Sequence, residues 1–125
     1  MSDRAETVMQ RRRVCAVEEI PPGSMKLVSA GKFGVGVYNV HGEFFAIANY
    51  CSHEGAPLCS GLVGGTNEFN AETGEMSYVR DGEIVRCPWH QWEFDLRTGQ
   101  TLSDPDRRIR TYRVDIHDGE VFVTV

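Results

Sequence analysis

The amino-acid sequence predicts an all-β fold of small antiparallel sheets, with two special loops between strands. Thirteen of its 125 residues are glycine, which indicates many tight turns. Apolar and polar residues alternate over short runs, and no window sustains the 3.6-residue apolar period of a helix. A chain of this length is enough for one domain, so we assign residues 1–125 to a single domain, with 1–12 as a candidate flexible N-terminal tail.

Strands are expected where the alternation runs between turn-forming residues. Pro21-Pro22-Gly23 ends the first run, and His41-Gly42, Asp81-Gly82 and Asp118-Gly119 each predict a two-residue hairpin turn. The expected strands are residues 13–17, 25–28, 32–40, 43–48, 83–86, 93–96, 110–116 and 120–125.

Three segments interrupt this alternation. Residues 49–65 and 87–92 are rich in cysteine, histidine, glycine and proline, a composition typical of ordered functional loops. Residues 66–80 are polar, and we expect them to form an excursion with a small hairpin of its own through residues 76–79.

The charge balance argues against some function classes. The formal net charge is −5 and the sequence pI is about 5.3, whereas a general nucleic-acid binder needs a basic footprint. The chain has no run of about 18 apolar residues and no apolar stretch after Arg11–Arg13, so we expect no membrane segment, no secretory signal and a cytoplasmic location. Arg11–Arg13 and the four arginines between residues 107 and 113 are either solvated strand ends or a docking patch for an acidic partner.

Two pairs of metal-binding residue types stand out in the two irregular loops. They are Cys51 with His53, and Cys87 with His90. In a reducing compartment such cysteines are better explained as metal ligands than as disulfides. Two thiolates and two imidazoles can enclose zinc tetrahedrally, or hold a [2Fe-2S] cluster with both thiolates on one iron and both imidazoles on the other. The four ligands by themselves leave both metals open.

The neighbouring residues favour the iron–sulfur alternative. The two boxes, C-x-H and C-x-x-H, resemble those of the Rieske [2Fe-2S] family, and the residues around them, Cys51 to Leu58 and Cys87 to Gly99, are similar as well. The resemblance extends over roughly residues 25–125 and is strongest to the small stand-alone Rieske ferredoxins of bacterial oxygenase systems.

This resemblance implies a Rieske-like fold and one [2Fe-2S] cluster, with Cys51 and Cys87 on the buried iron and His53 and His90 on the outer iron. It implies a soluble one-electron carrier that passes electrons from a flavin-dependent reductase to a terminal, ring-hydroxylating oxygenase. Pro105 is the candidate for the proline of the family's shielding loop.

The chain departs from parts of the family pattern. Respiratory members carry an extra cysteine in each box, joined as a disulfide; Ala56 and Trp89 stand at those positions, so no disulfide is expected. We expect Cys59 to be a free loop thiol and Cys15 a small core residue. The family usually has glycine where this chain has Gln91.

The hydroxyl donors of high-potential members are also missing. Trp92 and Phe94 occupy the positions of the serine and tyrosine that donate hydrogen bonds to the cluster sulfurs in those members. Fewer donors stabilise the reduced cluster less, so we expect a potential near the low end of the family range.

Nothing else in the sequence indicates a catalytic site. An oxygenase would need a second iron site, and only His41 and His117 remain, both expected at the surface. Tyr50, Trp89 and Trp92 flank the loops, where they either form an apolar docking surface or pack beneath the loops. Two alternative functions stay open: a structural zinc module, and the small Rieske-like subunit of a nitrite-reductase-like enzyme.

Overall fold

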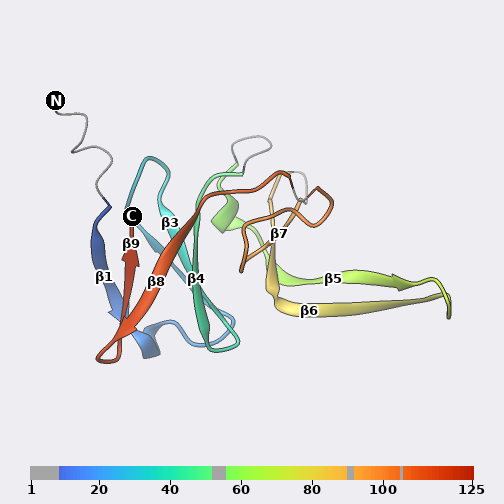
Figure 1. Cartoon of the computed structure of the whole chain (residues 1–125), viewed down its shortest axis with the longest axis horizontal. Coiled ribbons are helices and arrows are strands. Elements are labelled where there is room, and N and C mark those ends of the chain that lie inside the picture. The colour runs from blue at the N-terminus through green and yellow to red at the C-terminus, as the bar shows by residue number, and fades with distance from the viewer. Residues whose placement is uncertain (1–8, 52–55, 90–91, 105) are drawn as a thin grey trace.

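The computed structural model describes residues 9–51, 56–89, 92–104 and 106–125. Within this part of the chain the fold is almost entirely β, as predicted (Figure 1). The elements are β1 (Arg11–Ala16), the 3₁₀ turn η1 (Val17–Glu19), β2 (Met25–Val28), β3 (Val35–Val40), β4 (Glu43–Ala48), the 3₁₀ turn η2 (Leu58–Ser60), β5 (Val63–Asn70), β6 (Glu75–Arg86), β7 (Glu93–Asp95), β8 (Thr111–His117) and β9 (Glu120–Thr124). None of the helical segments in the described residues has the length and apolar character needed to cross a membrane.

The strands form two antiparallel sheets. The larger sheet has the order β1-β9-β8-β4-β3-β2, and the smaller has the order β5-β6-β7. Two register pairs, Ala46 with Tyr112 and Ile47 with Thr111, join β4 to β8 and so connect the two halves of the larger sheet. Its core includes Cys15, which is 2% exposed and packs as predicted against buried valines of β3 and β9.

A second core lies where the smaller sheet meets the larger one. It collects side chains from β3, β4, β6, β7 and the two irregular loops. Its buried members are Tyr38, Val40, Ile47, Cys51, Ala56, Leu58, Val85, Cys87, Phe94, Leu96 and Ile109. The expected metal site is therefore built on the core that both sheets share.

The structure confirms two of the three predicted hairpin turns. His41 and Gly42 have φ values of 51° and 95°, and Asp118 and Gly119 have 50° and 75°. Positive φ at both central residues is what a type I′ hairpin turn requires.

The predicted hairpin turn at Asp81-Gly82 is wrong, because the chain passes through it without leaving its partner strand. β6 pairs with β5 on both sides of this point, with Ile84 opposite Gly64 and Val79 opposite Thr66, so the extra residues form a bulge. His41 Nε2 donates a hydrogen bond to the Asp81 carbonyl at 2.7 Å, which fixes the bulge against the β3–β4 turn.

A chain of ion pairs also joins the smaller sheet to the larger one. Arg80, at the bulge, pairs with Asp95 of β7 at 2.5 Å and with Glu83 at 3.2 Å. Arg97 lies 3.9 Å from Glu83 and pairs with Glu43, at the start of β4, at 2.6 Å. The hydrogen bond to Asp95 is the largest of the interactions that raise the pKa of Arg80.

The N-terminal strand begins earlier than the sequence predicts. Arg11 and Arg12 belong to β1 and pair with Thr124 and Val123 of β9, so the ordered part starts inside the expected tail of residues 1–12. Arg11 pairs with Asp115 at 2.6 Å, and Arg13 pairs with Glu120 at 2.7 Å. For this basic cluster the structure supports the strand-end alternative, because cross-strand carboxylates neutralise two of its three charges.

Residues 66–79 form a long two-stranded ribbon that extends away from the larger sheet (Figure 1). We call this segment the arm. The excursion and its own hairpin were predicted, although the hairpin is longer than residues 76–79. The arm carries Phe69 and Met76 as a cross-strand pair, and both side chains are exposed.

A buried amide provides a test of the fold. Asn39 is 5% exposed; its Nδ2 donates to the Ile20 carbonyl and its Oδ1 accepts from the Gly42 N–H, both at 2.8 Å. The substitution Asn39→Ala leaves both backbone groups without these partners, so we expect the free energy of unfolding to fall by about 2 kcal/mol. Denaturant titration measures the change. The matched substitution Asn67→Ala, on the exposed arm, should stay within about 0.5 kcal/mol of wild type.

Candidate metal centre

Two loops, one from each sheet, carry the predicted cysteines. Cys51 follows β4 of the larger sheet, and Cys87 follows β6 of the smaller one. The Cys51 N–H donates to the Ala56 carbonyl, and the Cys87 N–H donates to the Trp92 carbonyl, both at 2.8 Å. Each loop therefore closes on itself five residues after its cysteine, so the two cysteines are held in the same way.

Both cysteines lie in an apolar environment. Cys51 is 0% exposed and Cys87 is 1% exposed, and they share the core that contains Leu58 and Phe94. None of the four cysteines of the chain is in a disulfide, as expected. The other two predicted ligands, His53 and His90, lie outside the described residues, as do Gln91 and Pro105.

The two loops meet at a glycine that the sequence analysis did not single out. A Cβ atom on Gly61 would lie 1.7 Å from the carbonyl oxygen of Arg86, the residue before Cys87. The Arg86 N–H in turn donates to the Leu62 carbonyl at 2.9 Å. Only glycine permits this approach, which places the end of the first loop directly against the start of the second.

The Asn49 side chain links the two ends of the first loop by a hydrogen bond. Its Oδ1 accepts a hydrogen bond from the Cys59 N–H at 2.8 Å, across the loop that contains Cys51. Its own N–H donates to the Gly34 carbonyl at 3.0 Å, which anchors this closure to the chain just before β3. Asn49 is thus a second residue of the site that sequence analysis missed.

The prediction that Cys59 is a free loop thiol is half right. Cys59 is not in a disulfide, but it lies in η2 and packs on β3, where a Cβ on Gly36 would come within 2.4 Å of its Sγ. Burial raises the pKa of Cys59. Burial, and after it the nearby Cys59 thiol, also raises the pKa of Tyr38, whose hydroxyl has no hydrogen-bond partner among the described residues. Cys59 is therefore a partly buried thiol packed against β3 rather than an open loop thiol.

The aromatic residues beside the loops divide into two groups. Trp92 is partly buried and packs against the shared core, as one of the alternatives predicts. Trp89 is 57% exposed and Tyr50 is 39% exposed, so these two rings lie at the surface next to the cysteines. His41 and His117 are both exposed, as expected.

An ion pair braces the second loop. Arg86, just before Cys87, contacts Glu93 just after the loop at 2.6 Å, and the Thr66 hydroxyl donates to the same carboxylate at 2.8 Å. Together with the Cys87–Trp92 hydrogen bond, this pair fixes both ends of the loop.

The donor set fits an iron–sulfur cluster. Two thiols without a disulfide lie in one dry core, on loops closed by equivalent hydrogen bonds. Thiolates are the usual protein ligands of such clusters. The apolar side chains around the two cysteines limit the access of solvent to the site.

The comparison with protein families agrees with this site. Residues 10–113 match the model of the Rieske [2Fe-2S] domain. The chain belongs to this family, and its cofactor is one [2Fe-2S] cluster. The alternative of a structural zinc module is therefore wrong.

Similar proteins include ferredoxin subunits of dioxygenases. The 3-phenylpropionate/cinnamic acid dioxygenase ferredoxin subunit of Photorhabdus laumondii is 33% identical over 121 residues, which cover 94% of this chain and 96% of that protein. The biphenyl dioxygenase ferredoxin subunit of Pseudomonas sp. (strain KKS102) is 32% identical and covers 89% of this chain and 88% of that protein.

Solved structures show the same fold. The Sphingomonas yanoikuyae B1 ferredoxin is 33% identical, with a TM-score of 0.67 over 93% of this chain and 99% of that one. A chain in the complex of reduced oxygenase and oxidised ferredoxin of carbazole 1,9a-dioxygenase is 28% identical, with a TM-score of 0.71 over 90% of this chain and 91% of that one.

The contact between the loops gives a direct test. In Gly61→Ala the new methyl group collides with the Arg86 backbone, so we expect the loops to separate and the free energy of unfolding to fall by about 3 kcal/mol, as in overpacked cores. The cluster content of the purified protein should fall with it. Gly74→Ala is the control: its φ is 75°, but a Cβ there meets nothing within 4 Å, so it should cost only about 1 kcal/mol and keep the cluster. Equal losses in both variants would contradict the prediction.

Proposed function

We propose that this protein carries single electrons from a flavin-dependent reductase to a terminal, ring-hydroxylating oxygenase. The observation that carries this proposal is the match, over nearly the whole length of both chains, to ferredoxin subunits of such dioxygenases. The structure of a related ferredoxin bound to its oxygenase supports the choice of partner.

We assign the cluster ligands to Cys51 and Cys87 for the inner iron and to His53 and His90 for the outer iron. The burial of both thiols and the matched closure of their loops support the first pair, and the C-x-H and C-x-x-H spacing supports the second. When bound, the cluster accepts and releases one electron, and the oxidation chemistry of the pathway belongs to the oxygenase.

The protein itself supplies a dry, fixed site and a face for its partners. Leu58 and Phe94, both 0% exposed, exclude water from the side of the core. Tyr50 and Trp89 are exposed beside the cysteines and offer aromatic contact surface to a partner that approaches the loops.

We also propose that residues 1–125 act as one domain in the cytoplasm. The two cysteines come from different sheets, and neither sheet alone can form the site. Four cysteines without a disulfide are in keeping with a reducing compartment.

The small subunit of a nitrite reductase is the weaker candidate. The corresponding structure from Mycobacterium tuberculosis is 21% identical with a TM-score of 0.71, which shows a shared fold alone. No contact or residue of the described structure favours that role over the electron carrier.

The ligand assignment predicts opposite results for two cysteine variants. Wild-type protein purified without oxygen should contain about two irons and two labile sulfides per chain and give the EPR signal of a reduced Rieske cluster. Cys87→Ser should lose the cluster and melt at a lower temperature, because one metal centre ties two distant loops together. Cys59→Ser is the matched control and should retain the cluster, because Cys59 packs against Gly36 of β3 and is not one of the assigned ligands. Stoichiometric zinc, or loss of the cluster in Cys59→Ser, would refute the assignment.

The reduction potential should lie near the low end of the family range, on the order of −150 mV. Phe94 is buried in the shared core and has no hydroxyl to donate. A hydroxyl added by Phe94→Tyr that reaches a sulfur stabilises the reduced form by about 1 kcal/mol, which corresponds to about 40 mV for one electron. Voltammetry should therefore show a rise of about 40 mV, and no change in Phe44→Tyr, which packs in the other core. A wild-type value above about +100 mV would instead indicate a respiratory-type carrier.

A further inference from the structure

The chain that follows β7 folds back beside this strand (orange in Figure 1). A β-bridge joins Thr101 to Phe94 of β7. We call residues 100–104 and 106–109 the return segment. Because β7 begins directly after the loop that contains Cys87, the return segment is fixed to the strand on which the second cysteine loop ends.

Backbone hydrogen bonds fix the position of Arg107 in the return segment. Its N–H donates to the Asp104 carbonyl at 2.9 Å, and its carbonyl accepts from the Thr101 N–H at 3.0 Å. Thr101 is 2% exposed, and its hydroxyl donates to the Asp104 carbonyl and accepts from the Asp104 N–H. Both backbone polar groups of Arg107 are therefore held, and its side chain extends from a fixed point.

The Arg107 side chain lies over Trp92, the residue that closes the second cysteine loop. The Cζ atom of its guanidinium group is 5.3 Å from the centroid of the Trp92 ring. This distance is within the range of about 6 Å in which a cation is attracted to the face of an aromatic ring. The Trp92 carbonyl accepts the Cys87 N–H at 2.8 Å, and Trp92 packs against the shared core. Trp92 thus joins the return segment to the loop of an assigned ligand.

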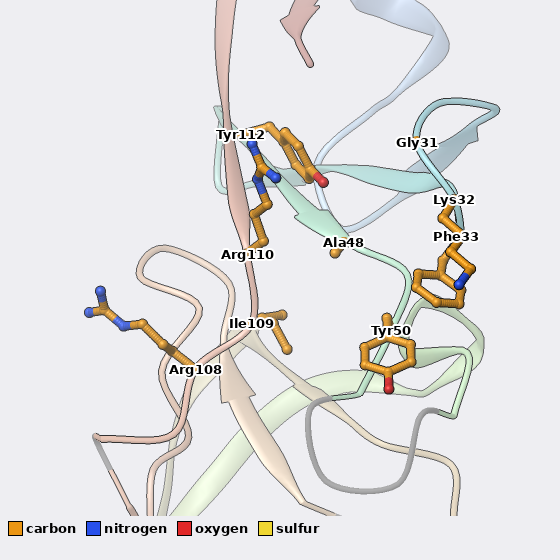
Figure 2. A pocket seen from close by; sticks show the side chains of 9 residues that line it. All are labelled: Gly31, Lys32, Phe33, Ala48, Tyr50, Arg108, Ile109, Arg110 and Tyr112. Carbon is orange, nitrogen blue, oxygen red and sulfur yellow. The ribbon is translucent and has the colours of Figure 1, made fainter. Parts of the chain in front are cut away.

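The neighbouring arginines of the cluster between residues 107 and 113 face elsewhere. Arg108 and Arg110 belong to the lining of a surface pocket of about 450 Å³ beside the first cysteine loop (Figure 2). In that view the Arg108 side chain points away from the pocket, and the Arg110 guanidinium lies 5.1 Å from the Tyr112 ring. Of the two arginines in this cluster that lie on an aromatic ring in the described structure, Arg107 is the one that contacts a cysteine loop.

The positive charge of Arg107 is only partly compensated. Its Nε lies 3.6 Å from the Asp104 carboxylate, whereas Arg86 and Glu93, at the ends of the same loop, approach to 2.6 Å. Reduction adds one negative charge to the cluster of a chain whose net charge is already −5. A cation held beside the second cysteine loop therefore stabilises the reduced form more than the oxidised form.

We propose that Arg107 is a positioning residue of the metal centre, which holds the return segment on Trp92 and places a positive charge where it favours the reduced cluster. This rests on the proposed function through the assignment of Cys87 as a ligand. Loss of the charge lowers the reduction potential, whereas entry of water alone would raise it, because water also stabilises the added negative charge. The Cys87–Trp92 hydrogen bond and the packing of Trp92 on the core do not involve Arg107, so we expect the effect of the charge to dominate.

Voltammetry on the cluster-containing protein tests this role. Arg107→Gln removes the charge and should lower the equilibrium constant for reduction at least about twofold at low salt, as expected for a partly screened charge. This corresponds to a fall of about 18 mV for one electron. Asp104→Asn removes the opposing charge and should raise the potential. Arg12→Gln removes the same charge as Arg107→Gln from β1, at the far edge of the larger sheet, and should match wild type. High salt should reduce both shifts.

Two further measurements separate the charge from the contact. Arg107→Lys retains a positive charge without the planar guanidinium group, so it should keep the wild-type potential. In Arg107→Gln the contact with the Trp92 ring is lost. A chelator of ferrous iron should therefore remove the cluster from this variant at least about twofold faster than from wild type, the size expected for loss of an exposed cation–π contact.

The proposal is overturned by an unchanged or raised potential in Arg107→Gln, by an equal fall in Arg12→Gln, or by equal rates of iron loss in Arg107→Gln and wild type. If Arg107→Gln does not retain its cluster, Asp104→Asn provides the test, and an unchanged potential in that variant overturns the proposal. No reductase or oxygenase takes part in these measurements, so failure of this proposal is distinct from failure of the electron-carrier function.

Discussion

The site depends on one close approach of backbone to backbone, between Gly61 and the carbonyl of Arg86. The two cysteines are far apart in sequence and follow strands of different sheets, so no local preference of the chain brings them together. The absence of a side chain at Gly61 lets the first loop rest on the residue before Cys87. Equivalent hydrogen bonds, from the Cys51 N–H to the Ala56 carbonyl and from the Cys87 N–H to the Trp92 carbonyl, link the two ends of each loop.

The sequence predicts the type of metal centre, but it does not predict the residues that hold the two loops in place. Cysteine and histidine at short fixed spacings indicate a metal centre because few other functions need them there. Gly61 and Asn49 act through atoms of Arg86 and Cys59, and only the fold brings those partners close. Their residue types are common in any loop, so no pattern marks them.

The Asp-Gly pairs and the arginine clusters also show that local sequence does not determine which partner a residue finds in the fold. An Asp-Gly pair can adopt positive φ both in a hairpin turn and in a β-bulge, so the sequence does not distinguish the two. At Gly82 the structure shows a bulge, because β6 continues to pair with β5 beyond it. The two arginine clusters look equivalent in sequence, but acids of β8 and β9 neutralise Arg11 and Arg13, while Arg108 and Arg110 have no such neighbours in the described structure. In both examples, segments with the same local composition differ in structure because their partners come from distant parts of the chain.

The ion pairs that join the two sheets have a consequence for how long the protein keeps its cofactor. Arg80 and Arg97 link β7 and the bulge of β6 to the start of β4, and the three-stranded sheet has few other strands to hold it. Local opening of this sheet would withdraw Cys87 while the larger sheet stays folded. Salt screens such partly exposed pairs. If Cys87 is a cluster ligand as proposed, we therefore expect the lifetime of the cluster-containing protein to depend on its smaller sheet and to shorten in concentrated salt.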